Sequence, residues 1–275
     1  MPETFLILLA GGVMLASAVP RPADVTLHWL RLAGILALSF CGLGLFFYFR
    51  REPPMPHMAP LLWRIQMGLL LTTTIAVLGQ LAFAQVGWRG AQRALALTAF
   101  LLAVLGGSNL LHELMFARGT ALLLYMPPLP PKAADMLVQT LACAGVAAMT
   151  GLVLMAMLLG HAYLTASKMT MAPFRRLNLA LAVAIGLRAV LGAGAAYVAW
   201  RDPPVDLLWA WYGLQIGTRW LVGLVVPAVF VYMTHDCVRR RATQSATGIL
   251  YVAGVLVFIG ELIALWLTRE TALAF

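Results

Sequence analysis

Residues 247–268 read TGILYVAGVLVFIGELIALWLT, and this stretch carries one charged side chain, Glu261. A helix that crosses the hydrocarbon core of a bilayer needs about 20 mostly apolar residues, so this stretch is long enough to span a membrane. Seven similar stretches precede it. The eight predicted spans are residues 4–19, 27–49, 61–85, 93–112, 134–164, 177–200, 206–233 and 247–268. We therefore predict an all-α fold, a polytopic integral membrane bundle of about eight transmembrane helices.

The composition of the chain supports this class of protein. Its 275 residues are 62% hydrophobic and 11% charged, whereas a soluble domain carries about 25% charged residues. We expect the excess apolar side chains to face the lipid bilayer and residues 1–275 to form a single transmembrane domain with no soluble domain. A P-loop, a GxSxG motif and an HExxH motif are all missing from the sequence. The chain is therefore expected to be at most a non-autonomous subunit of an enzyme.

The net charge of +9 has an explanation other than nucleic-acid binding, because the basic residues form short clusters between the apolar runs. Such clusters orient helices in a membrane. Ten basic residues fall on one side of the predicted bundle, including the cluster Arg239, Arg240 and Arg241, and seven fall on the other side. This bias predicts that the first side is cytoplasmic and that both termini lie outside.

The first span resembles a secretory signal peptide, but its leading residues carry Glu3 and no basic residue. We expect it to be kept as a helix.

The longest predicted connection runs from residue 113 to about residue 133 and contains four prolines, which prevent its end from being helical. Pro227 is expected to kink the seventh helix. Small residues predict where helices approach closely. Those singled out are Gly186, Gly192, Gly194, Gly213 and Gly217.

Three charges stand out far from the ends of the apolar spans: Arg188, Arg219 and Glu261. Charge inside a span is costly and marks a candidate functional site. Counted from the cytoplasmic helix ends at 1.5 Å per residue, Arg188 lies about 16 Å deep and the other two about 21 Å deep. We predict that they face each other or a shared cavity, with Glu261 pairing one arginine and leaving the other in need of a partner.

The seventh span adds a polar stripe to these charges, because Tyr212, Gln215 and Arg219 stand at i, i+3 and i+7. Such a stripe is suited to line a cavity for a quinone or a polar solute. A purely structural ion pair that holds three helices together is the alternative, since buried pairs can be architectural.

Histidines suggest a second kind of site. His28, His161 and His235 all fall at predicted cytoplasmic helix ends, and two of them could supply the axial ligands of a b-type haem. His161 is also a candidate for proton relay or quinone contact. The alternative is that all three are ordinary interfacial residues at helix ends.

Two further groups of polar or sulfur-containing side chains are candidate sites. Asn109, His112 and Glu113 share one face at the predicted outer end of the fourth span, where they could form a proton entry point, a quinone head-group site or simply a solvated helix end. Thioether and imidazole groups suit copper(I). The candidate copper ligands are Met55, His57 and Met58.

The run Thr218–Pro227, TRWLVGLVVP, followed by Gly260-Glu261-Leu262, resembles the quinone-interacting membrane subunits of bacterial respiratory complexes, the family of the polysulfide-reductase membrane subunit. The resemblance covers about a fifth of the chain. It implies an eight-helix subunit in the bacterial inner membrane that binds quinone without haem, at Arg219 and Glu261, beside an iron–sulfur or cytochrome subunit. A rival resemblance, to copper-resistance permeases, rests on the helix number and the Met/His cluster. A structural anchor is the third possibility. A quinone subunit should show an apolar side cavity that reaches Arg219 or His161.

Overall fold

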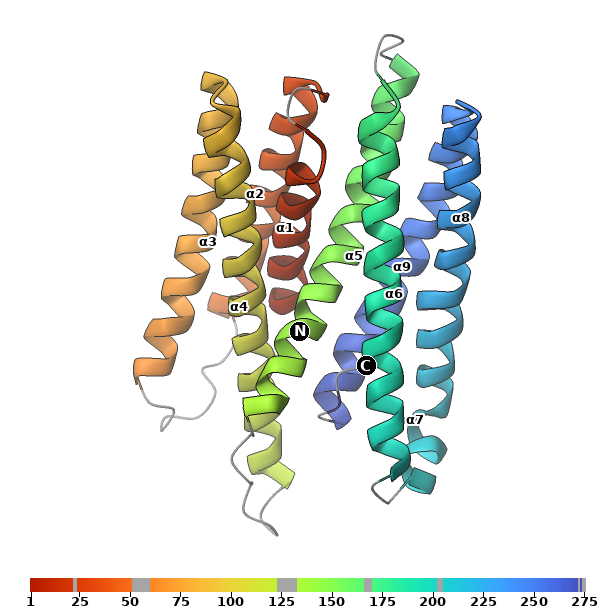
Figure 1. Cartoon of the computed structure of the whole chain (residues 1–275). Coiled ribbons are helices and arrows are strands. Elements are labelled where there is room, and N and C mark those ends of the chain that lie inside the picture. The colour runs from red at the N-terminus through yellow and green to blue at the C-terminus, as the bar shows by residue number, and fades with distance from the viewer. Residues whose placement is uncertain are drawn as a thin grey trace.

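The computed structural model describes residues 1–21, 24–50, 60–122, 133–165, 170–201, 205–271 and 273. These ranges are helical throughout, apart from short turns, and contain no strand. The elements are α1 (Pro2–Ala18), α2 (Leu27–Arg50), α3 (Pro60–Val86), α4 (Arg89–Leu122), α5 (Ala133–Thr165), α6 (Ala172–Arg201), α7 (Val205–Trp220), η1 (Leu221–Val225), α8 (Val226–Arg239) and α9 (Thr243–Thr271). Because α7, η1 and α8 continue one another, the described residues form eight helical rods (Figure 1).

Seven of these rods are long and apolar enough to cross a membrane. The eighth, α1, is apolar but only 17 residues long. Large apolar side chains also cover the outer surface, among them Leu214, Val190 and Val86, which are 82%, 70% and 68% exposed. Apolar surface on this scale is unfavourable in water and favourable against lipid tails. The chain is therefore a multi-pass helical membrane protein, as the sequence predicts.

The predicted loop from residue 113 is partly helical, because α4 continues through Leu122. Its 34 residues extend about 51 Å at 1.5 Å per residue, well beyond a hydrocarbon core of about 30 Å. The predicted span ends where the chain leaves the apolar core, whereas the helix itself ends only where backbone hydrogen bonding stops. The prolines that follow, Pro127 to Pro131, lie outside the described residues.

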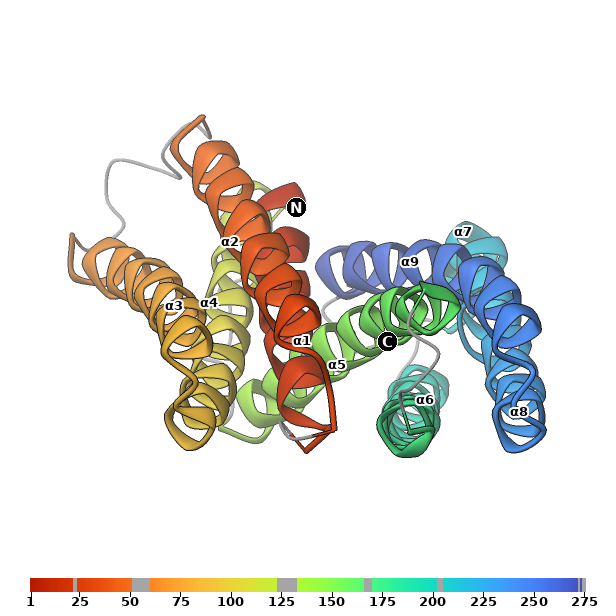
Figure 2. The same cartoon turned by 90° about the horizontal axis from the view of Figure 1, so that it is seen from above.

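The shortest of the eight rods, α1, lies in the interior of the bundle. α1 packs against α2, α4 and α5, and α5 also contacts α6 and α9. Seen from above, α5 runs diagonally between the group formed by α1–α4 and the group formed by α6–α9 (Figure 2). Ile7, Leu8, Val13 and Met14 of α1 are completely buried. The segment that resembles a signal peptide is therefore part of the core.

Glycines permit the closest contact in this core. A Cβ atom built on Gly12 of α1 would lie 1.8 Å from the carbonyl oxygen of Ala147, and one on Gly151 of α5 would lie 1.9 Å from the backbone of Gly12. Backbones that approach this closely are typical of helix packing in lipid. The glycines singled out on α6 and α7 divide into two kinds. Gly186, Gly194 and Gly217 meet no atom within 4 Å, because they lie on open helix faces, whereas a Cβ on Gly192 would lie 3.4 Å from the ring of Trp220.

Candidate functional site

The three charges inside the spans meet in the interior. Arg188 of α6 places Nη2 at 2.7 Å from Oε2 of Glu261 on α9, and its Nε donates a longer bond of 3.4 Å to Oε1. Arg219 at the end of α7 places its own Nη2 at 3.0 Å from the same Oε1. The exposed fractions of the three side chains are 0%, 2% and 0%. The prediction that these residues face one another is confirmed, and we call them the charge cluster.

One detail of the prediction is wrong. Glu261 was expected to pair with one arginine and to leave the other without an anion, but its two oxygens serve both arginines. A carboxylate has about four lone-pair sites, so it can accept from two guanidinium groups at once. The cluster nevertheless keeps a formal charge of +1, because two arginines face one glutamate.

An unusual backbone segment brings Arg219 to α9. The N–H of Val226 bonds to the carbonyl of Leu221, five residues earlier, and this is the hydrogen bond of the π-helix η1. Pro227, which follows Val226, has no N–H to donate to the preceding turn. The sequence predicted a kink at this proline, and the structure has the widened turn η1 directly before it. Such π-bulges often occur at functional sites.

Two glycines let this widened turn touch α9. A Cβ on Gly223 would lie 2.7 Å from the Cα of Gly260 and 2.9 Å from Nη1 of Arg219, and a Cβ on Gly260 would lie 2.2 Å from the Cα of Gly223. The arginine therefore crosses over Gly223 toward Glu261, which directly follows Gly260. A side chain at either glycine would separate the helices and lengthen the ion pair.

A third glycine, Gly145, packs against the other arginine, Arg188. A Cβ on Gly145 of α5 would lie 2.2 Å from Cδ of Arg188. The aliphatic stem of Arg188 therefore packs directly on the α5 backbone, which turns its guanidinium toward α9. The sequence analysis did not single out Gly145, Gly223 or Gly260 for packing. Their proximity to span charges across a helix interface is not visible in one sequence.

Some polar atoms of this region have no hydrogen-bond partner among the described residues. They are Nη1 of Arg188, Oε1 of Gln215 and both Nη atoms of Arg219, of which Nη2 lies 3.0 Å from Oε1 of Glu261 as an ion pair. Leaving a buried donor unsatisfied costs about 1–3 kcal/mol, and more for a charged group. Tyr212, the first member of the predicted stripe, packs edge-on against Trp266 with ring centroids 5.6 Å apart. The cluster thus offers surplus hydrogen-bond donors and a positive charge, and the aromatic pair lies about 8–11 Å from it along α9 and α7.

The second half of α4, at the predicted outer end of the fourth span, contains a separate polar group. Asn109 donates to Oε1 of Gln66 at 2.6 Å, and Gln66 donates to the carbonyl of Gly106 at 3.2 Å. Glu113 is buried and His112 is half-buried beside it on the same helix. Gln66 was not predicted, because Asn109 was compared only with its neighbours on the same helix and Gln66 lies on α3. A buried amide in an apolar span is the signal that could have found it.

The three histidines do not form a buried pair. His28, His161 and His235 are all exposed, near the ends of α2, α5 and α8. A haem held between helices needs axial ligands directed into the interior. The described residues also contain no group of three or more His, Cys, Asp or Glu side chains that could hold a metal ion. The proposed copper ligands Met55, His57 and Met58 lie outside the described residues.

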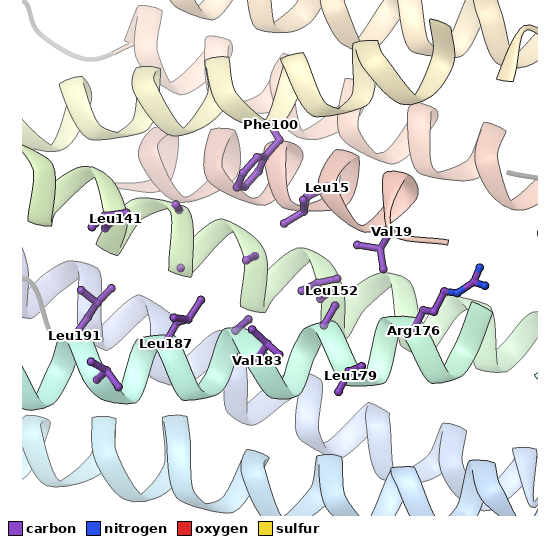
Figure 3. Close-up of a pocket in the computed structure, with 16 residues that line it drawn as sticks. Leu15, Val19, Phe100, Leu141, Leu152, Arg176, Leu179, Val183, Leu187 and Leu191 are labelled. Carbon is purple, nitrogen blue, oxygen red and sulfur yellow. The ribbon is translucent and has the colours of Figure 1, made fainter. Parts of the chain in front are cut away.

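A lateral apolar groove of about 670 Å³ lies between α6 and the helices α1, α4 and α5 (Figure 3). Gly145, against which the aliphatic stem of Arg188 packs, is one of the residues that line this groove. Neither Arg219 nor His161 lines it, so this groove is not the quinone cavity that the sequence analysis expected at those two residues.

No family model, curated protein or solved structure matches this chain. The class of protein, a multi-pass helical membrane protein with a buried charge cluster, is therefore defined by the fold and the site alone.

Proposed function

We propose that the chain is a membrane subunit of an electron-transfer complex in the bacterial inner membrane and that the charge cluster contacts the head group of a quinone. The observation that carries this proposal is the pair of unused donors, Nη1 of Arg188 and Nη1 of Arg219, in the interior of the bundle. A quinone carbonyl only accepts hydrogen bonds, so it complements these donors. The surplus positive charge would also stabilise the anion formed when a quinone takes up one electron.

The aromatic pair on α7 and α9 fits the same ligand. Tyr212 and Trp266 offer flat apolar rings close to the helix that carries Arg219, and ligand sites combine such surfaces with a few convergent polar groups. Reduction of a quinone also consumes protons. His112 and Glu113 are the titratable members of the outer polar group, whereas the amides of Gln66 and Asn109 do not titrate. We assign proton exchange to this pair.

The decisive experiment is quinone binding by the purified chain, together with any subunits that accompany it. Arg219→Gln should weaken binding of a short-chain benzoquinone by roughly 10- to 100-fold, because a hydrogen bond from a charged donor contributes about 1.5–3 kcal/mol. The variant should still fold, since Arg188 and Glu261 remain as a neutral pair. Arg239→Gln is the matched control, because the Arg239 side chain is 72% exposed at the end of α8. Equal affinity of the wild-type protein and Arg219→Gln would refute the proposal.

A purely structural role is the second candidate, and one observation favours it. Both oxygens of Glu261 are engaged by arginines, so the cluster ties α6, α7 and α9 together without any ligand. In that case neither variant binds quinone differently from the wild-type protein, and the purified chain carries no quinone.

A further inference from the structure

The lateral groove has a long apolar body and one polar end. Its floor consists of small residues of α5, including Ala144, Gly145 and Ala148, and one wall is formed by α6 from Arg176 to Leu191. Arg176 is the one polar side chain among its lining residues. Figure 3 shows Arg176 and Val19 together at one end and Leu141 and Leu191 at the other.

The length of the groove matches one leaflet of a bilayer. Arg176 and Leu191 are fifteen residues apart on α6, which corresponds to about 22 Å along the helix. Half of a bilayer, head groups included, is about 20–22 Å thick. With Arg176 at the head-group level, the groove would therefore end near the bilayer centre. Arg188 lies about 18 Å from Arg176 on the same scale, which is consistent with that depth.

The polar end of the groove is positively charged. Arg176 pairs with Asp24 of the α1–α2 connection at 2.8 Å. Arg21 belongs to the same turn, because its carbonyl accepts a hydrogen bond from the N–H of Asp24, and its side chain is exposed. Arg175, next to Arg176, is exposed as well. Three arginines and one aspartate leave a surplus of two positive charges.

We propose that this groove holds an acyl chain of an anionic phospholipid whose phosphate lies against Arg21, Arg175 and Arg176. Basic pockets between transmembrane helices bind anionic head groups, with about 1 kcal/mol contributed per Lys or Arg near the membrane surface. An isoprenoid quinone fits this groove less well, because the apolar lining offers no donor for its carbonyls beyond Arg176. Arg188 does not line the groove, although its stem packs on Gly145, which does, and the lipid proposal does not depend on the proposed quinone site.

Native mass spectrometry of the detergent-solubilised full chain tests this proposal. The protein is titrated with dioleoyl phosphatidylglycerol and, separately, with dioleoyl phosphatidylcholine, so that the acyl chains are identical and only the head-group charge differs. We expect one tightly retained phosphatidylglycerol. The double variant Arg21→Gln and Arg175→Gln should bind it about 25-fold more weakly, which is about fivefold for each arginine. Both side chains are exposed, so the fold should be unaffected.

A second pair of variants tests the groove itself. Ala180→Phe places a ring in the groove and should abolish retention of phosphatidylglycerol, whereas Ala182→Phe, on an exposed face of the same helix and outside the groove, should not. Equal binding of the two lipids by the wild-type protein would overturn the proposal. So would retention of phosphatidylglycerol by Ala180→Phe at the wild-type level, or a quinone in the groove in place of the phospholipid. None of these outcomes depends on whether the charge cluster binds quinone.

Discussion

Replacement of Glu261 by glutamine is expected to be among the most damaging conservative changes in the charge cluster. Glutamine keeps the shape of the side chain and removes its negative charge. The change leaves Arg188 and Arg219, which are 0% and 2% exposed, as two uncompensated cations directed at one point. Breaking one buried ion pair costs about 3–5 kcal/mol, because the remaining charge stays desolvated. Glu261→Gln breaks two, so we expect a loss at the upper end of that range or beyond it.

The loss can be measured as a shift in thermal unfolding of the detergent-solubilised protein. For chains of 150–250 residues, 1 kcal/mol corresponds to about 2–4 °C, so a loss of 3–5 kcal/mol predicts a Tm lower by roughly 6–20 °C. Asp236→Asn is the control, since it removes a carboxylate that is 40% exposed and pairs with exposed arginines at the end of α8. Exposed pairs contribute about 0–1 kcal/mol, so its Tm should change by less than about 4 °C.

The geometry also predicts which second changes restore stability. If Glu261 paired with Arg219 alone, Arg219→Gln combined with Glu261→Gln would leave no unpaired charge. Because Arg188 is the closer partner of Glu261, that double variant still contains a buried cation and should remain unstable. Adding Arg188→Leu should recover most of the lost Tm, since no charge is then left. A wild-type Tm for Glu261→Gln, or full recovery in the double variant, would refute this reasoning.

Three further predictions follow from the fold. Gly12→Ala should lower the yield of assembled protein in size-exclusion chromatography, because its Cβ would meet the α5 backbone, whereas Gly186→Ala on an open face should be neutral or slightly stabilising. Asp24→Asn should lower the Tm by less than about 4 °C, because its ion pair with Arg176 is half-exposed, and a larger drop would show that this pair is a main tie between α1 and α6. A peptide tag placed within residues 236–245, which already contain the free Cys237, should not be recognised by an antibody applied to intact cells, and recognition from outside would reverse the predicted orientation.

The sequence predicted positions along each helix well. Apolar length located all eight rods, and the rise per residue placed Arg188, Arg219 and Glu261 at depths close enough for the ion pairs that the structure contains. These quantities depend on distance along a single helix, which residue numbers supply directly.

The rotation of each helix about its axis and the identity of the helices that it contacts could not be predicted in the same way. In lipid nearly every face of a helix is apolar, so hydropathy does not tell which glycine meets another helix. Gly186 faces open space while Gly12 lies against α5. Glu261 was assigned one partner for the same reason, namely that contacts between helices cannot be read from one sequence. The distance from Arg219 to Glu261 depends on the contact of Gly223 with Gly260, and these two glycines lie on different helices.

The central position of α1 also bears on how the protein is made. Transmembrane helices form first and associate afterwards. α1 is synthesised before the helices that pack against it, and α5, one of its main neighbours, ends at Thr165. At 5–20 residues per second, the roughly 150 residues in between take about 7–30 s to synthesise. During that interval Gly12 of α1 must be covered by lipid, by the insertion machinery or by α2 and α4. The core around α1 is therefore complete only when Gly151 and its neighbours on α5 replace that temporary cover.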